Sequence, residues 1–365
     1  MLTKCWIKDF RNLKEIVIDF SEDKNLFIYG DNNQGKTNFL EALFFLGNGQ
    51  SPRDSNILNL ISFDKKESIL GINIIKPSKP HRIYARISNK GIKSFVLDDK
   101  PIYRMSSLFK TIPISYVSSD VIRLFQDSPE ERRRCLDRFW SHYNPQYSML
   151  IKKFKIALKQ KNKCLELQSN HHQLELWNTQ FIKISEIIVQ ERMKAVSCLN
   201  SSLVPLVKKI VEGVSDVSMA YQVKGINRSH FSASDYAMFL AQTCKDNKMK
   251  EMNAGRSLYG PQRDDFEIQV DNRSLFSFYS RGINRTVAIL LKCAEWDQFK
   301  EKTGVYPVLL LDDTFSELDS DMKKKLISLL EIKTQLVYAS VMKEDVTLFQ
   351  QAGMYRMASG VMSRG

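Results

Sequence analysis

A phosphate-binding loop constrains this chain more than any other feature of its sequence. Eight consecutive residues fit the pattern G-x-x-x-x-G-K-[ST] without a mismatch: Gly30, Asp31, Asn32, Asn33, Gln34, Gly35, Lys36 and Thr37. The loop follows an apolar strand pattern at 26–29 and precedes a helix pattern rich in Phe and Leu at 39–46. Because strand, loop and helix stand in the order that the motif requires, the sequence predicts an α/β fold built around a nucleotide.

The chemistry of the loop indicates ATP with Mg²⁺. Backbone N–H groups of the loop and of the following helix N-terminus would wrap the phosphates. Lys36 would reach the β- and γ-phosphates, and the Thr37 hydroxyl would hold Mg²⁺. Gly35 would let the backbone approach the phosphates closely.

A second acidic site follows much later in the chain. The apolar run Leu309–Leu311 ends in Asp312 and Asp313, which is the Walker B arrangement of a buried strand that directs a carboxylate to the metal. We assign Asp312 to Mg²⁺, through water, and Asp313 to orienting or polarising the attacking water. Alone the pattern also fits a strand that ends in a polar turn, and its position downstream of the phosphate loop favours the catalytic interpretation.

The net charge and the cysteine content indicate which kind of partner and which cellular compartment to expect. The 365 residues contain 54 Lys plus Arg and 41 Asp plus Glu, a formal net charge of +13. Such an excess favours a polyanionic partner, either nucleic acid or an anionic membrane, although a basic surface kept for solubility also fits. We find no signal peptide and no apolar run long enough to span a bilayer. Six scattered cysteines predict neither a zinc site nor disulfides, so we expect a reducing cytoplasm.

The layout of patterns predicts an α/β core made from both ends of the chain. Apolar and polar residues alternate in pieces over 69–97, which predicts an antiparallel meander. A serine, a proline and two acids at Ser128–Glu131 predict a helix start, and the chain stays mostly helical to about Val211. Strand patterns return at 265–270, 308–311 and 336–339, with a helix pattern at 285–300 between the first two.

Two segments on either side of the Walker B strand specify the class of ATPase. Ser280, Arg281 and Gly282 precede a helix, and Thr314–Asp319 follows the strand, with Ser316 and Asp319 in the position of a D-loop. This order resembles the ABC-type ATPases, in which the Ser-x-Gly signature contacts the γ-phosphate bound by the opposite subunit. A helix N-terminus is a ready anion site, although Ser280-Arg281-Gly282 by itself also fits an ordinary capped helix start.

Taken in order, the motifs resemble the RecF family, the SMC-like recombination mediators of bacteria, over essentially the whole chain. The segments that carry the resemblance are Phe10–Asn12, Gly35–Ala42, Ser128–Asp137, Gly260–Asp265, Ser280–Gly282 and Leu311–Asp319. The resemblance implies an ABC/SMC-type P-loop ATPase head, with a mixed sheet, an antiparallel β subdomain and an inserted α-helical lobe. We expect lobe I, with the Walker motifs and D-loop, over 1–117 and 305–365, and lobe II, with the signature, over 118–304.

Three positions depart from the family pattern. Asn33 stands where a third glycine is usual, and Asn tolerates positive φ better than most residues. Ile283 and Asn284 replace two signature glutamines, so contacts across a dimer are expected to be weaker because Ile283 cannot donate a hydrogen bond. Ser118-Ser119-Asp120 replaces the usual Ser-Pro-Glu, which affects the loop that couples binding to hydrolysis.

The resemblance also implies a function in recombinational repair and replication restart. ATP would drive dimerisation on gapped, single-stranded or double-stranded DNA, and slow, DNA-stimulated hydrolysis would release the dimer. The expected partners are RecO, RecR and the RecA recombinase, with a link to the SOS response. We expect a cytoplasmic, nucleoid-associated protein without membrane contact.

Lysines and arginines of the helical region are candidates for DNA contact. The arginines are Arg132, Arg133, Arg134 and Arg138, and the lysines are Lys152, Lys153, Lys155, Lys159, Lys161 and Lys163. They could neutralise phosphates without reading bases. A solvated helix face is the alternative, and the arginines could instead serve packing.

Other ATPase classes fit less well. A transporter subunit or another SMC-like repair ATPase remains the alternative, although the helical insertion, the positive charge and the absence of a histidine near Ser340 disfavour a transporter. A P-loop kinase or a nuclease-fused ATPase is also disfavoured. About 50 residues follow Asp313, fewer than a nuclease domain of ordinary size needs.

Overall fold

The chain forms two compact units in the computed structural model. Unit 1 comprises Met1–Ile122 and Gly304–Gly365, and unit 2 comprises Arg123–Thr303. The structure describes all residues except 76–79, 92, 104, 106–107, 109–112, 120–128, 169–170 and 227–231. Two residues used in the sequence analysis, Asp120 and the helix-start residue Ser128, lie outside the described residues.

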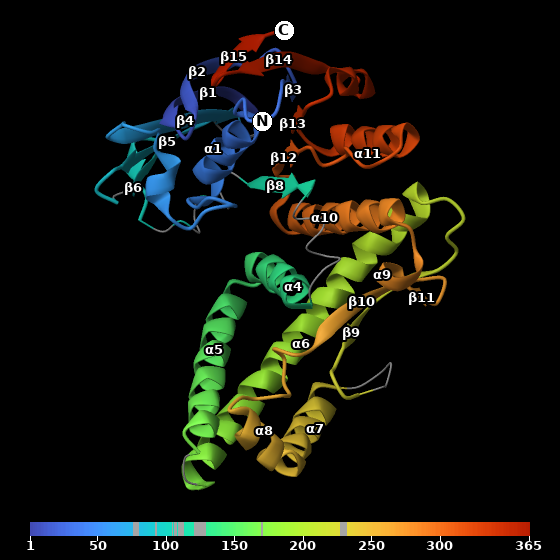
Figure 1. Ribbon diagram of the computed structural model, residues 1–365. Coiled ribbons are helices and arrows are strands. Elements are labelled where there is room, and N and C mark those ends of the chain that lie inside the picture. The colour runs from blue at the N-terminus through green and yellow to red at the C-terminus, as the bar shows by residue number, and fades with distance from the viewer. Residues whose placement is uncertain are drawn as a thin grey trace. The chain divides into compact units, whose positions relative to one another are not determined.

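A mixed six-stranded sheet, the central sheet, carries the phosphate loop of unit 1 (Figure 1). Its strand order is β15-β14-β3-β13-β12-β8, parallel throughout except for the β14–β15 hairpin. The strands are β3 (Asn25–Tyr29), β8 (Ile114–Ser118), β12 (Val308–Asp312), β13 (Leu336–Ser340), β14 (Ala352–Ala358) and β15 (Val361–Arg364). The predicted strands at 26–29, 308–311 and 336–339 are confirmed, and their apolar runs are buried as parallel strands require, except for the half-buried Tyr29 at the end of β3.

An antiparallel sheet of six strands forms the other β layer of unit 1, in the order β2-β1-β4-β5-β6-β7. The strands are β1 (Leu2–Phe10), β2 (Leu13–Asp19), β4 (Glu67–Ile75), β5 (Pro80–Ser88), β6 (Lys93–Leu97) and β7 (Lys100–Pro101). The predicted meander over 69–97 is therefore confirmed as β4, β5 and β6, which pair in sequence order. The first strand of the chain, β1, pairs with β4 and joins the N-terminal hairpin to this meander.

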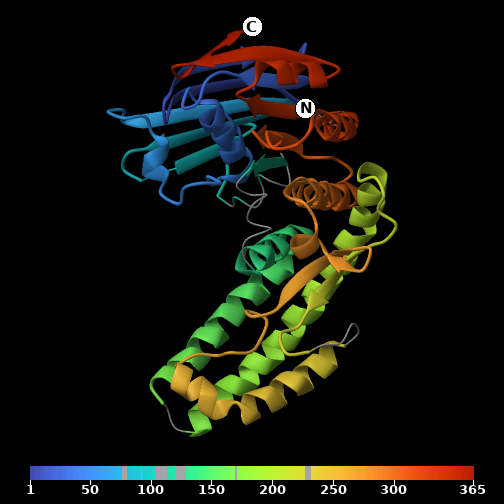
Figure 2. The same ribbon diagram turned by 45° about the vertical axis from the view of Figure 1, so that its right-hand side comes forward.

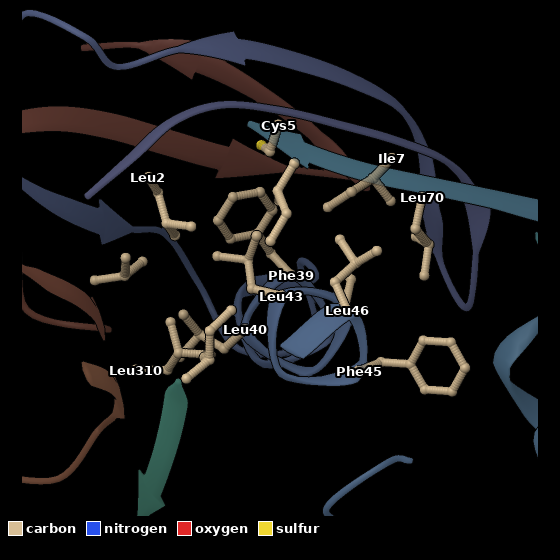
Figure 3. Close-up of a cluster of buried hydrophobic side chains, with 14 of the residues drawn as sticks. Leu2, Cys5, Ile7, Phe39, Leu40, Leu43, Phe45, Leu46, Leu70 and Leu310 are labelled. Carbon is tan, nitrogen blue, oxygen red and sulfur yellow. The ribbon is translucent and has the colours of Figure 1, made fainter. Parts of the chain in front are cut away.

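Helix α1 (Lys36–Asn48) begins at the phosphate loop and lies in the core of unit 1. Figure 3 shows side chains from β1, β4 and β12 gathered around its apolar residues, among them Phe39, Leu43 and Leu46, which are fully buried. Among its described residues, unit 1 also contains the helices η1 (Ile57–Leu60), α11 (Ser320–Lys333) and η2 (Lys343–Leu348). Because α1 is buried on several sides, the loop at its N-terminus has a rigid support.

Unit 2 is mostly helical, as the sequence predicts for 129–211. Its helices are α4 (Pro129–Tyr143), α5 (Pro145–Glu166), α6 (His171–Ile210), α7 (Ala233–Asp246), α8 (Lys248–Ala254), α9 (Leu275–Phe278) and α10 (Arg281–Thr303). A small antiparallel sheet accompanies them, in the order β11 (Arg273–Ser274), β10 (Asp265–Val270) and β9 (Val217–Gln222). Helices α5 and α6 run side by side in Figures 1 and 2 and pack through Phe154 and Phe181, whose rings lie 5.8 Å apart. Within the described residues, no helix is both long and apolar enough to cross a bilayer.

Candidate nucleotide site

The phosphate loop occupies the turn between β3 and α1, at the carboxyl end of the parallel strands. Lys36 reaches back over the loop, where its Nζ donates to the carbonyl oxygens of Gly30 at 2.6 Å and Asp31 at 2.8 Å. Burial lowers the pKa of Lys36, and the nearby carboxylates of Asp312, Asp313 and Asp31 oppose that shift. The ammonium group is therefore held at the loop, where a polyphosphate would supply stronger acceptors.

Three residues of the loop adopt positive φ, and two of them are glycines and one is an asparagine. Gly30 has φ 150°, and a Cβ there would lie 2.3 Å from the carbonyl oxygen of Met357. Gly35 has φ 116°, and a Cβ there would lie 2.7 Å from a methyl group of Leu13. Asn33 has φ 62°, and its carbonyl oxygen accepts a hydrogen bond from the Asn12 side chain at 3.1 Å. The loop thus accommodates asparagine at the position where the family usually has glycine.

The turn between β14 and β15 supports the loop from the C-terminal end of the chain. The Ser359 backbone N–H donates to Gln34 Oε1 at 2.6 Å, and the Gly360 N–H donates to the Gln34 carbonyl oxygen at 3.0 Å. Gly360 also accepts from the Lys14 N–H at 3.1 Å, so one turn touches both the loop and the β1–β2 hairpin. No sequence motif indicates this support, because Gln34 and Ser359 are 325 positions apart in the chain.

A cavity of about 480 Å³ opens beside the loop. The residues that line it include Gly30, Asp31 and Gln34 of the loop, together with Lys343 and Arg356. Lys343 Nζ lies 5.4 Å from the centre of the Tyr29 ring. The cavity therefore offers both backbone groups and two cationic side chains next to the phosphate loop.

Asp312, at the end of β12, faces the first turn of α1. The Thr37 hydroxyl donates to Asp312 Oδ1 at 3.1 Å, and the Tyr116 hydroxyl donates to Oδ2 at 2.9 Å. Burial raises the pKa of Asp312, and the hydrogen bonds from Tyr116 and Thr37 counteract that increase. A hydroxyl and a carboxylate that face each other are hard oxygen donors of the kind that Mg²⁺ prefers, so these residues fit the metal. Tyr116 is a site residue that the sequence motifs do not indicate.

Asp313 and the following D-loop residues have defined backbone positions. Asp313 adopts φ 46°, and its N–H donates to the Ala339 carbonyl oxygen of the neighbouring strand at 2.9 Å. The Ser316 hydroxyl donates to the Asp313 carbonyl oxygen at 3.1 Å. Asp319 caps α11, since its Oδ1 accepts from the Met322 N–H at 2.8 Å. Backbone pairing with β13 therefore fixes the start of this acidic segment, and the cap of α11 fixes its end.

The signature residues lie in unit 2, at the N-terminus of α10. Ser280 and Arg281 are exposed, Gly282 is half-buried, and Ser280 Oγ accepts from the Ile283 N–H at 3.4 Å. Asn284 is buried and donates to the Tyr279 carbonyl oxygen at 3.2 Å. The two residues that replace the family glutamines thus have different roles. The Asn284 side chain donates a hydrogen bond at the start of its own helix, whereas the apolar side chain of Ile283 cannot donate one.

The cationic residues of unit 2 divide into internal and external groups. Arg132 pairs with Asp265, with Nε at 3.0 Å from Oδ1, and Arg133 donates to the Asp264 carbonyl oxygen at 2.6 Å. The exposed lysines of α5 are Lys152, Lys153, Lys155, Lys159 and Lys163. Lys161 is fully buried and pairs with Glu251 at 2.9 Å. The prediction that Lys161 contacts DNA is therefore wrong, because its charge is already neutralised inside the protein.

Comparisons with known proteins agree with this fold. The family model of the RecF/RecN/SMC N terminal domain matches residues 1–363. The DNA replication and repair protein RecF of Halothermothrix orenii is 32% identical over 340 residues, which cover 92% of this chain and 90% of that protein. The RecF protein of Clostridium kluyveri is 29% identical over 364 residues, covering 98% and 97%.

Solved structures share the fold over the full length. The recombination mediator protein RecF-ATPrS in the RecFOR pathway superposes with a TM-score of 0.84 at 24% identity, covering 100% of this chain and 98% of that chain. The Smc head domain of Pyrococcus furiosus, solved with an extended coiled coil and bound to the C-terminal domain of ScpA, gives 0.57 at 18% identity, covering 99% and 95%. The predicted ABC/SMC-type ATPase fold is thus confirmed.

Proposed function

Because this chain belongs to the RecF family of DNA replication and repair proteins, we propose that ATP binding switches it between a free form and a dimer on DNA. The observation that carries the proposal is the hydrogen bond between Thr37 and Asp312, which joins the phosphate loop to the acidic end of β12 across 275 residues of sequence. Lys36 lies at the same loop and supplies the cation for the β- and γ-phosphates.

Each residue of the site has a distinct proposed role. The loop from Gly30 to Thr37 binds the phosphates through its N–H groups. Thr37 and Asp312 would hold Mg²⁺, which would supply positive charge to neutralise the phosphate oxygens. Asp313 orients the attacking water, since its backbone is fixed by pairing with β13. Asp313 therefore contributes to ATP hydrolysis, whereas Lys36 contributes to ATP binding.

The signature completes the site in a second copy of the chain. The exposed Ser280 hydroxyl and the N–H groups at the start of the 23-residue helix α10 form an anion site. We assign this site to the γ-phosphate bound by the partner copy, so that ATP becomes a dimerisation ligand. Lobe I, 1–117 and 305–365, then supplies the phosphate loop, Asp312 and the D-loop residues Ser316 and Asp319, while lobe II, 118–304, supplies the signature.

DNA contact is assigned to a stripe of lysines on α5, the lysine stripe, made of Lys152, Lys155, Lys159 and Lys163. These four are exposed, and their spacing of three and four residues places them on one side of the helix over roughly 16 Å. A cavity of about 630 Å³ along this side is lined by Lys155, Lys159 and Lys163, among others. Lys153 lies about a quarter turn away from the stripe.

The pathway assignment follows from the family. RecF proteins are named for DNA replication and repair, and the related solved structure belongs to the RecFOR pathway. We therefore propose RecO and RecR as partners, loading of RecA as the outcome, and a cytoplasmic, nucleoid-associated location.

Light scattering with and without ATP and DNA tests this function. The wild-type chain should be monomeric at micromolar concentration without ATP and dimeric with ATP and DNA. Lys36→Met should stay monomeric, because the loop loses its phosphate cation. Asp313→Asn should bind ATP and remain dimeric on DNA, because only hydrolysis is slowed. A wild-type chain that stays monomeric with ATP and DNA would exclude the sandwich dimer, and identical behaviour of the two variants would refute their separate roles.

A further inference from the structure

Tyr116 of β8 contacts the carboxylate that we assign to Mg²⁺. Its hydroxyl donates to Asp312 Oδ2 at 2.9 Å, while Thr37 Oγ1 lies 3.1 Å from the other oxygen, Oδ1. The two oxygens of one carboxylate thus have separate partners. Tyr116 approaches from β8 and Thr37 from α1, so the carboxylate is held from two elements.

The position of Tyr116 is fixed by strand pairing and by ring packing. Strand β8 pairs in parallel with β12, with Tyr116 opposite Leu310 and Ser118 opposite Asp312. The Tyr116 ring packs against Phe44 of α1, with ring centres 6.0 Å apart. A tyrosine hydroxyl carries one proton that it can donate, and here the strand pairing and the ring packing direct it to Asp312.

We propose that Tyr116 is a positioning residue, which fixes the Asp312 carboxylate through Oδ2 in the orientation in which Asp312 and Thr37 would hold Mg²⁺. Without the hydroxyl, the carboxylate could rotate about its Cβ–Cγ bond, and the metal would have to order it. Outer partners that orient a metal ligand typically change metal affinity by about 10- to 100-fold when they are removed. This inference rests on the proposed ATPase function.

The test compares Tyr116→Phe with the wild-type protein and with a matched control, Tyr355→Phe. Tyr355 is a buried strand tyrosine whose hydroxyl donates to the Asp23 carboxylate at 3.0 Å, outside the nucleotide site. Binding of a fluorescent ATP analogue is titrated with Mg²⁺ and then repeated in EDTA. For Tyr116→Phe, the Mg²⁺ concentration at half-maximal effect should rise about tenfold, with analogue affinity in EDTA and the thermal unfolding midpoint unchanged. Tyr355→Phe should leave the Mg²⁺ dependence at the wild-type value.

Three results would overturn the inference. The first is an unchanged Mg²⁺ dependence in Tyr116→Phe, which would make the hydroxyl a packing group. The second is an equal loss of analogue affinity in EDTA, which would mean that Tyr116 supports the phosphate loop and not the metal. The third is a wild-type protein that binds the analogue without any Mg²⁺ effect, in which case the proposed metal assignment fails together with the role of Tyr116.

Discussion

At the scale of single residues, the position of a lysine in its helix decides whether its charge is available to a partner. Lys161 lies among the cations of α5 but faces the interior of unit 2. Its Nζ is 2.9 Å from Glu251 Oε2 and 4.8 Å from the centre of the Phe181 ring. Glu251 Oε1 in turn accepts from the Ser257 hydroxyl at 3.0 Å and the Leu258 N–H at 2.8 Å. Lys161 therefore links α5 to α8 through the ion pair and α5 to α6 through the contact with the Phe181 ring.

Replacing Lys161 by Met should destabilise the protein without weakening its binding to DNA. The substitution leaves Glu251 buried and without its cation, which typically costs about 3 kcal/mol or more in unfolding free energy. Urea unfolding measures the loss, and fluorescence anisotropy with labelled DNA measures affinity at a temperature where the variant is folded.

Lys159→Met is the control, since Lys159 is exposed on the same helix. It should change the unfolding free energy by no more than about 0.5 kcal/mol and should weaken DNA binding. A Lys161→Met variant with wild-type stability, or with a loss of DNA affinity equal to that of Lys159→Met, would contradict the assignment of Lys161 to the interior.

The burial of Lys161 could have been predicted from helical spacing. Phe154, Ala157 and Leu165 are buried, and Lys161 follows Ala157 by four residues and precedes Leu165 by four, so it shares their face. Tyr116 carries no such local signal. Its contact with Asp312 depends on the pairing of β8 with β12, two strands about 195 residues apart.

At the scale of elements, the phosphate loop depends on two turns that its motif does not contain. The β1–β2 turn supplies Asn12, which donates to the Asn33 carbonyl oxygen. The β14–β15 turn supplies Ser359 and Gly360, which hold Gln34. The eight-residue motif predicts what the loop binds, but the preformed shape of the loop comes from strands at both ends of the chain.

Gly360→Ala should weaken ATP binding through the β14–β15 turn. Gly360 has φ 76°, and a Cβ there would lie 2.0 Å from the Asn12 carbonyl oxygen, so the β14–β15 turn must shift from Asn12 and its hydrogen bond to Gln34 would be disturbed. Strain of this kind costs about 1–3 kcal/mol, and we expect about a tenfold loss of ATP affinity, measured by isothermal titration calorimetry.

Gly91→Ala is matched to this variant in backbone conformation. Gly91 has φ 77°, but a Cβ there would meet no atom within 4 Å. It should lower the unfolding free energy by about 1 kcal/mol and leave ATP affinity unchanged. Equal ATP affinities for the two variants would show that the β14–β15 turn does not shape the loop.

Sequence patterns predicted the elements that carry strong periodicity or a motif. Strands β3, β12 and β13, the meander and helices α4 to α6 follow from apolar runs and from the acidic, proline-containing helix start. The hairpin of β14 and β15 was not predicted, because its seven- and four-residue strands mix apolar with exposed polar residues. Its place beside β3 is set by parallel pairing that no local signal encodes.

At the scale of the whole molecule, the cations behind the net charge of +13 divide into ion-paired and exposed side chains. Part of the positive charge is neutralised inside the protein, as in the pairs Arg132–Asp265, Lys161–Glu251 and Arg192–Asp137. The lysine stripe of α5 is exposed. Because ATP would join two copies, the dimer would carry two such stripes, and counterion release makes DNA affinity steeply dependent on salt.

Salt titrations of DNA binding test both the stripe and the switch. The wild-type slope of log affinity against log salt should be steeper with ATP than without it, since dimerisation combines the phosphate contacts of two copies.

Replacing Lys152, Lys155, Lys159 and Lys163 by Met should flatten the slope by up to about 3.6 per chain on duplex DNA, at about 0.9 for each phosphate contact. Replacing four exposed lysines outside α5, Lys208, Lys209, Lys245 and Lys250, changes the net charge equally and should flatten it much less. Equal slopes for the two quadruple variants would show that charge acts through the whole surface and not through α5, and equal wild-type slopes with and without ATP would show that nucleotide binding does not combine the stripes.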